Sequence, residues 1–248
     1  MGISIAYQGK LSSPDLITDL ITDLKARAAA AGWICKTMDE LVAEGRVEGP
    51  GLRGLSLYLH KECEPVRLHV DDEGTFVNHF YHDLLRNEGK ARMMMEALAE
   101  SMTLTRTIAG KGKKKKKKKA AGGMAPGLRV SVPDLGAKPS GNFLEQGLRY
   151  NWTKTQFAGP EVHVAVCALL RHVKERYAPD LQVTDDTRYF EDGDHAKLQG
   201  AFAHLDRVVD LTARAFESAA AGSPGPTTIE GLLDRVNDEL AGADDKLH

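Results

Sequence analysis

Hydrophobic and polar residues alternate near the start of the chain and then recur at helical spacing. Residues 3–7 alternate, which predicts a half-buried strand. Ser13, Pro14 and Asp15 are typical of a helix N-terminus, and the apolar positions after them predict a helix that ends at Gly32. Alternation predicts further strands at residues 33–38, 55–59, 66–70 and 75–78. The middle two should form an antiparallel hairpin, each strand with one face in water.

The second half of the chain continues this mixture of strands and helices. Pro160 and Glu161 open a strongly amphipathic helix that should end before Pro179, and Asp192 or Asp194 should cap a long later helix. The other expected elements are a helix at residues 90–103, strands at 148–156, 181–184 and 187–190, and, after a linker at 222–226, a terminal amphipathic helix capped by Thr227 and Glu230.

This order of elements predicts an α+β fold. Hairpins outnumber βαβ units, so we expect an antiparallel or mixed sheet with helices packed mainly on one face. Four parts are expected: an N-terminal α+β half at residues 1–106, a flexible insertion rich in lysine and glycine at 107–141, a C-terminal strand-helix-strand-helix half of the same domain at 142–218, and a linker with the amphipathic terminal helix at 219–248.

The formal net charge of −2 hides an uneven distribution. Lys111 and the run from Lys113 to Lys119 carry eight positive charges, which leaves −10 on the rest of the chain. An acidic body is a poor surface for nucleic acid, which favours a broad positive face. The lysine run can attract a polyanion weakly, without aromatic residues for base stacking. A solvated insertion without a binding role is the alternative.

Composition also limits the compartment and the cofactors. No stretch of about eighteen apolar residues occurs, so no membrane span is expected, and the N-terminus lacks the pattern of a secretory signal. Three scattered cysteines, Cys35, Cys63 and Cys167, do not suggest a disulfide framework and are interpreted as buried apolar residues. A cytoplasmic protein is predicted, and no motif indicates a cofactor.

The first candidate site is the junction between the strand that ends at Gln156 and the helix that begins near Glu161. Lys154 and Gln156 share a strand face, and the free N–H groups of the helix attract anions. The hypothesis is an anion or small-ligand site made of Lys154, Gln156, Glu161, His163, Tyr189 and Glu191. The alternative, and the commoner arrangement, is an ordinary connection with Lys154 in solvent.

Histidine, cysteine and acidic residues raise the question of a metal site, and no ligand set is predicted. His163 and Cys167 lie on one side of their helix, either as half of a metal site or as buried groups with a hydrogen-bonded histidine. His60 and His69 are too far apart along the hairpin to share a zinc ion. Turns and N-caps account for the acidic residues at 185–194. A surface location is therefore predicted for four histidines: His60, His69, His79 and His82.

Four segments carry a resemblance to known proteins. They are residues 2–11 (GISIAYQGKL), 153–163 (TKTQFAGPEVH), 179–183 (PDLQV) and 189–194 (YFEDGD). These segments resemble a family of bacterial proteins for which no activity is established. The resemblance implies a shared fold and a bacterial, cytosolic setting, and the lysine run does not belong to the shared pattern.

The sequence supports two functional hypotheses. No catalytic motif of high specificity occurs, whereas a tethered amphipathic helix and a charged insertion are common means of contacting partners. The first hypothesis is therefore a non-enzymatic binding or scaffold protein of a bacterial cytosolic assembly, with a protein partner. The second is an enzyme that binds a small ligand or anion at the junction 152–163. A pocket that gathers the junction side chains favours the second, and a His163 inside a packed core disfavours it.

Overall fold

A computed structural model describes residues 2–48, 51–87, 89, 92–93 and 147–221 of the chain. The lysine run, most of the helix expected at 90–103, and the linker and terminal helix expected after residue 221 lie outside these residues. Within the part described, the α+β fold class is confirmed, with two three-stranded antiparallel sheets. No helix in this part combines the length and the apolar character needed to cross a bilayer.

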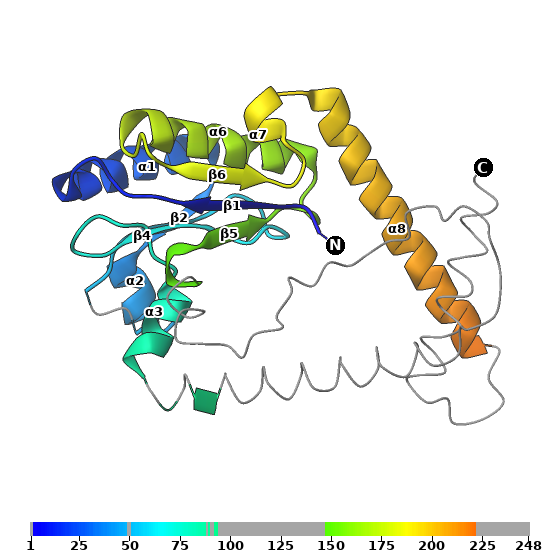
Figure 1. Cartoon of the computed structure of the whole chain (residues 1–248), viewed down its shortest axis with the longest axis horizontal. Coiled ribbons are helices and arrows are strands. Elements are labelled where there is room, and N and C mark those ends of the chain that lie inside the picture. The colour runs from blue at the N-terminus through cyan, green and yellow to red at the C-terminus, as the bar shows by residue number, and fades with distance from the viewer. Residues whose placement is uncertain (1, 49–50, 88, 90–91, 94–146, 222–248) are drawn as a thin grey trace, which may run out of the picture.

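The first sheet joins strands that are far apart in the sequence (Figure 1). Strand β1 (Ser4–Gln8) is central and antiparallel to both β5 (Asn151–Lys154) and β6 (Gln182–Asp185). Because β5 and β6 therefore run in the same direction, helix α6 (Pro160–Arg176) connects them as a crossover. The N-terminal strand is thus the middle of a sheet whose edges come from the C-terminal half, and both halves form one folded unit.

The second sheet contains the predicted hairpin. Its order is β2 (Ile34–Thr37), β3 (Arg53–Tyr58) and β4 (Val66–Val70), all antiparallel. The segment before β4 reaches β5 of the first sheet, where the Glu64 N–H donates to the Lys154 carbonyl at 3.1 Å. The two sheets are thereby joined along neighbouring edges.

One hydrophobic core lies between these sheets and the helices α1 (Ile17–Ala31) and α6. The helix α1 follows a 3₁₀ turn, η1 (Pro14–Leu16), and ends at Gly32, whose positive φ of 70° is favourable for glycine. Both predicted ends of this helix are confirmed. Completely buried side chains from every layer meet in the core, among them Ile5, Leu20, Leu57, Leu68 and Leu170.

The opposite face of the second sheet is covered by two helices, α2 (Met38–Ala43) and α3 (His79–Arg86), as Figure 1 shows. They enclose a smaller apolar cluster that includes Met38, Leu41 and Val77. Neither helix is predicted from the hydrophobic pattern, because each is short. The expectation of a solvent-exposed hairpin face is wrong for this reason.

The chain after β6 differs from the prediction of a strand at 187–190. This segment forms a turn and the short helix α7 (Tyr189–Asp192), because Arg188 has a positive φ of 63° and reverses the chain. Helix α8 (His195–Ala221) follows and spans about 40 Å at 1.5 Å per residue. Asp194 caps it by accepting from the Lys197 N–H at 3.0 Å, as predicted. In Figure 1 the later part of α8 extends away from the sheets.

Candidate functional site

A buried polar network lies where α6 meets the ends of β5 and β6. His163 Nδ1 is 2.8 Å from Thr155 Oγ1, and His163 Nε2 is 3.0 Å from Asp185 Oδ2. Thr187 Oγ1 lies 3.2 Å from the same Nε2 atom. The side chains of His163 and Asp185 have no exposed surface. The interpretation of His163 as a buried, hydrogen-bonded histidine is confirmed.

Asp185 is ionised inside this network. Burial alone would raise its pKa, but the hydrogen bonds from His163 and from the backbone N–H groups of Thr187 and Phe190 outweigh it and lower the pKa to about 2. These N–H groups lie 2.8 and 2.9 Å from the carboxylate oxygens. A charge of this kind is tolerated in a protein interior only because its acceptor sites are filled.

Cys167 completes a set of three residues with metal-ligand chemistry. Ligand atoms of His163, Cys167 and Asp185 all lie within 4.8 Å of one another. Burial, and then the neighbouring charge of Asp185, raise the pKa of the Cys167 thiol well above its ordinary value. The ligand atoms of His163 and Asp185 are already engaged in hydrogen bonds, which a metal ion would have to displace. The set fits a structural network better than a metal centre.

The order Thr155, His163, Asp185 also resembles a nucleophile, a base and an orienting acid. Such a relay acts only where a substrate carbonyl or phosphorus atom can reach the hydroxyl. Thr155 and His163 are both 0% exposed, so no substrate reaches either. The network therefore holds the two strands and the helix together.

The residues of the predicted junction site are only partly brought together. His163 and Tyr189 are neighbours, with ring centroids 6.3 Å apart, and the Tyr189 hydroxyl is 3.0 Å from His195 Nε2. Gln156 is half-buried against Gly2, while three members of the set lie in solvent outside this cluster: Lys154, Glu161 and Glu191. Strand β5 ends at Lys154, so the face predicted to continue to Gln156 does not.

Two network members, Thr155 and Thr187, are not singled out by the sequence pattern. In the sequence, Thr153 and Thr155 occupy alternate positions of the predicted strand, so they share one face, and the structure buries both. Thr187 lies two residues after Asp185, whose carboxylate accepts from the Thr187 N–H as in an Asx turn. Neither signal indicates a catalytic role.

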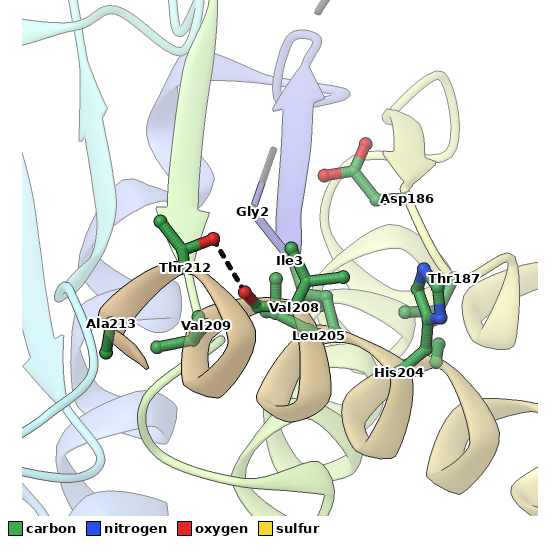
Figure 2. A pocket seen from close by; sticks show the side chains of 11 residues that line it. Gly2, Ile3, Asp186, Thr187, His204, Leu205, Val208, Val209, Thr212 and Ala213 are labelled. Atoms are coloured by element: carbon green, nitrogen blue, oxygen red, sulfur yellow. Dashed lines mark hydrogen bonds between the residues drawn. The ribbon is translucent and has the colours of Figure 1, made fainter. Parts of the chain in front are cut away.

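A large surface groove lies between α8 and the beginning of β1 (Figure 2). Its volume is about 900 Å³, and its walls are mostly aliphatic, with Ile3, Leu205, Val208 and Val209 among them. The Thr212 hydroxyl, which also faces the groove, donates to the Val208 carbonyl at 2.7 Å and so is satisfied within the helix. We call this feature the α8 groove.

One end of the α8 groove is polar and firmly attached to the first sheet. The Asp186 carboxylate accepts from the Ser4 N–H at 2.9 Å and from the Ser4 hydroxyl at 2.7 Å. Thr187, which lines the groove, also contacts His163 of the buried network. None of the six residues of the predicted junction site lines the groove.

The prediction of surface histidines is corrected for His69. It lies on the face of β4 that α2 and α3 cover, is 0% exposed, and its Nε2 is 3.0 Å from Ser56 Oγ. Its ring meets that of His79 at a centroid distance of 5.2 Å. Burial lowers the pKa of His69 to about 3 and that of His79 to about 4, so both are neutral at pH 7.

Comparison of the chain with protein-family models, with curated proteins and with solved structures finds no match. Kinship with the bacterial family that four segments resemble therefore stays a prediction.

Proposed function

We propose that this chain is a non-enzymatic binding protein of a bacterial cytosolic assembly, which receives an amphipathic helix of a partner protein in the α8 groove. The observation that carries the proposal is the apolar face of α8, which continues from the core into solvent. Leu198 and Phe202 are buried, Leu205 is half-buried, and Val209 is 49% exposed. An apolar surface that leaves the core in a continuous groove is typical of an interaction site.

The shape of the groove suits a helix better than a compact ligand. Its α8 wall runs from Ala201 to Ala213, which is about 18 Å at 1.5 Å per residue. A helix laid along such a wall presents anchors at i, i+3, i+4 and i+7. The internally bonded Thr212 adds a methyl group to the wall and requires no polar partner.

The chain itself contains a sequence of the required kind. Residues 227–241, outside the described residues, carry aliphatic positions at helical spacing, namely Ile229, Leu232, Leu233, Val236 and Leu240. This pattern defines the chemistry expected of the partner helix: one aliphatic stripe with acidic and amide residues on the other side. It also supplies a probe for the groove.

The enzymatic alternative at the junction 152–163 has less support. His163 has no contact with solvent, and Lys154 and Glu161 are exposed and do not line the α8 groove. Polyanion binding by the run from Lys113 to Lys119 remains a separate prediction outside the described residues. Neither idea uses the α8 groove.

A labelled peptide of residues 227–241 tests the proposal on the full-length chain. The chain carries Leu232→Asp and Leu233→Asp, so that its own terminal segment does not compete. Fluorescence anisotropy should show saturable binding. Adding Val209→Asp places a charge in the apolar wall and should weaken binding about tenfold or more, since 1.4 kcal/mol is a factor of ten.

Ala203→Asp is the matched control, because Ala203 is exposed on the same helix but does not line the groove. It adds the same charge and should leave the affinity unchanged. Absence of saturable binding, or equal losses in the Val209 and Ala203 variants, would overturn the proposal.

A further inference from the structure

A second, smaller cavity lies on the face of the second sheet that α2 and α3 cover. Its volume is about 210 Å³, and its lining includes two arginines and three other polar residues: Arg46, Ser56, Tyr58, Arg67 and His79. We call it the arginine cavity. It shares none of its described lining residues with the α8 groove.

Arg67 is a half-buried cation without a counter-charge. It lies on β4 opposite Ser56, and its backbone is fixed because its N–H donates to the Tyr7 hydroxyl at 2.9 Å. Among the residues that the structure describes, no carboxylate forms an ion pair or hydrogen bond with its guanidinium. After burial itself, the charge of Arg67 is a cause of the low pKa of His79. Charges in protein interiors are normally paired, so this one favours an anion in the cavity.

Ser56 offers a neutral donor from the neighbouring strand. Its Oγ atom is 3.0 Å from Nε2 of the buried His69, whose Nδ1 has no hydrogen-bond partner among the described residues. In the tautomer with the proton on Nε2, His69 donates to Ser56 Oγ. The Ser56 hydroxyl proton is then free to donate into the arginine cavity.

Arg46 supplies the second positive charge at the rim. Its guanidinium lies over the Tyr58 ring, 5.6 Å from the centroid, and 3.9 Å from a carboxylate oxygen of Glu44. Glu44 also forms a bidentate contact with Lys36 at 2.6 Å, so its charge is shared between two cations. The nearby carboxylate of Asp83 accepts from the Glu48 N–H at 3.2 Å. Carboxylates therefore lie near Arg46 at the opening, whereas none is paired with Arg67 among the described residues.

We propose that the arginine cavity binds a phosphate group, either as free phosphate or as the end of a small phosphate ester. Two guanidiniums, the Ser56 hydroxyl and the His79 imidazole line the cavity. A tetrahedral oxyanion has acceptor oxygens for all of them, whereas a carboxylate has two oxygens in one plane. The volume is below the range of about 300–1,000 Å³ that drug-sized ligands occupy, so only the phosphate end is enclosed.

The test follows the imidazole NMR signals of His79 in the full-length chain, assigned with His79→Gln. A site-specific signal is needed because the lysine run attracts any phosphate. Titration with inorganic phosphate at pH 7.5 and constant ionic strength should shift these signals with saturation. Arg67→Gln should weaken binding about tenfold or more, the scale of one charge-assisted hydrogen bond. Arg46→Gln, at an exposed position that tolerates change, should weaken it several-fold.

Arg53→Gln is the matched control, since Arg53 is exposed on β3 and does not line the cavity. It should leave the titration unchanged. Phosphoserine and acetate form the other arms. Tighter binding of phosphoserine identifies an ester as the ligand, equal or weaker binding identifies the free ion, and acetate should not saturate. His79 signals that do not move with phosphate, or that move equally in the Arg46 and Arg53 variants, would overturn the proposal.

Discussion

Asp185 shows how one buried charge is made compatible with a packed interior. A carboxylate offers about four lone-pair sites. Four N–H and O–H donors fill them: His163 Nε2, the Thr187 N–H, the Thr187 hydroxyl and the Phe190 N–H. The Cys167 thiol adds a longer, weaker contact at 3.8 Å. The donors come from α6 and from the turn after β6. The carboxylate therefore fixes the turn that leads into α7 and, through α7, the start of α8.

Replacing Asp185 with asparagine should destabilise the protein strongly. The amide turns one acceptor oxygen into a donor that faces donors already in place. We expect a loss of about 3 kcal/mol in the free energy of unfolding, measured by urea denaturation at pH 7. Asp186→Asn is the control at the exposed neighbour, and it should cost less than about 1 kcal/mol. Equal losses in the two variants would contradict the role given to the buried carboxylate.

Wild type and the Asp185→Asn variant should also differ in how their stability responds to acid. The folded pKa of Asp185, about 2, lies below its ordinary value of 3.8. Its contribution to stability is therefore complete above about pH 4 and is lost as pH falls through about 2. The stability gap between wild type and Asp185→Asn should narrow over this interval, which urea denaturation at pH 5, 4, 3 and 2.5 would show. A gap that stays constant would count against an ionised Asp185.

Among the elements, the β3–β4 hairpin requires a glycine where the backbones of its two strands approach each other most closely. Gly54 has a φ of 124°, and a Cβ atom there would lie 2.0 Å from the Leu68 carbonyl oxygen. Gly54→Ala should cost about 3 kcal/mol or more, because backbone strain and the clash add. Gly45→Ala, with a φ of 67° and open space around it, should cost only about 1 kcal/mol. Urea denaturation of the two variants separates the clash from the strain.

The two histidines covered by α2 and α3 should make the protein less stable below neutral pH. His69 and His79 have an ordinary pKa of 6.5 when unfolded and about 3 and 4 when folded. The contribution of the two neutral histidines to the free energy of unfolding is complete above about pH 6.5. It falls by about 1.4 kcal/mol per pH unit for each histidine as pH drops toward 4, because only the unfolded chain binds the protons. Urea denaturation at pH 7, 6 and 5 should give a steeper decline for wild type than for the variant with His69→Gln and His79→Gln. Parallel declines would contradict this account.

At the scale of the whole molecule, the sequence predicts most elements but not how they cover one another. The ends of α1, the hairpin and the start of α6 follow from local patterns and are confirmed. The burial of His69 is not predictable in this way, since it depends on α2 and α3, which are too short to show a helical period. Likewise, a strand pattern at 187–190 cannot reveal that Asp185 binds Thr187 and Phe190 and bends the chain into α7. Local preference fixes elements, whereas long-range contacts decide burial.

The amphipathic segment that follows α8 in the sequence is expected to compete for the α8 groove. Residues 222–226 separate α8 from the amphipathic segment 227–241, and short connections favour antiparallel packing of successive helices. As a helix that segment would span about 22 Å, which from Ala221 reaches back to the neighbourhood of Val209. If the proposed helix-binding function holds, this segment is an intramolecular competitor at an effective concentration of about 1 mM.

Wild-type chain should therefore bind the labelled 227–241 peptide about tenfold more weakly than the chain with Leu232→Asp and Leu233→Asp, as measured by fluorescence anisotropy. Arg235→Glu changes the net charge by the same amount but lies on the polar side of the predicted helix, so it should leave the weak wild-type binding unchanged. Equal affinity in wild type and in the Leu232/Leu233 variant would show that the terminal segment does not reach the groove. Tight binding after Arg235→Glu would instead show that charge, rather than the aliphatic stripe, governs the competition.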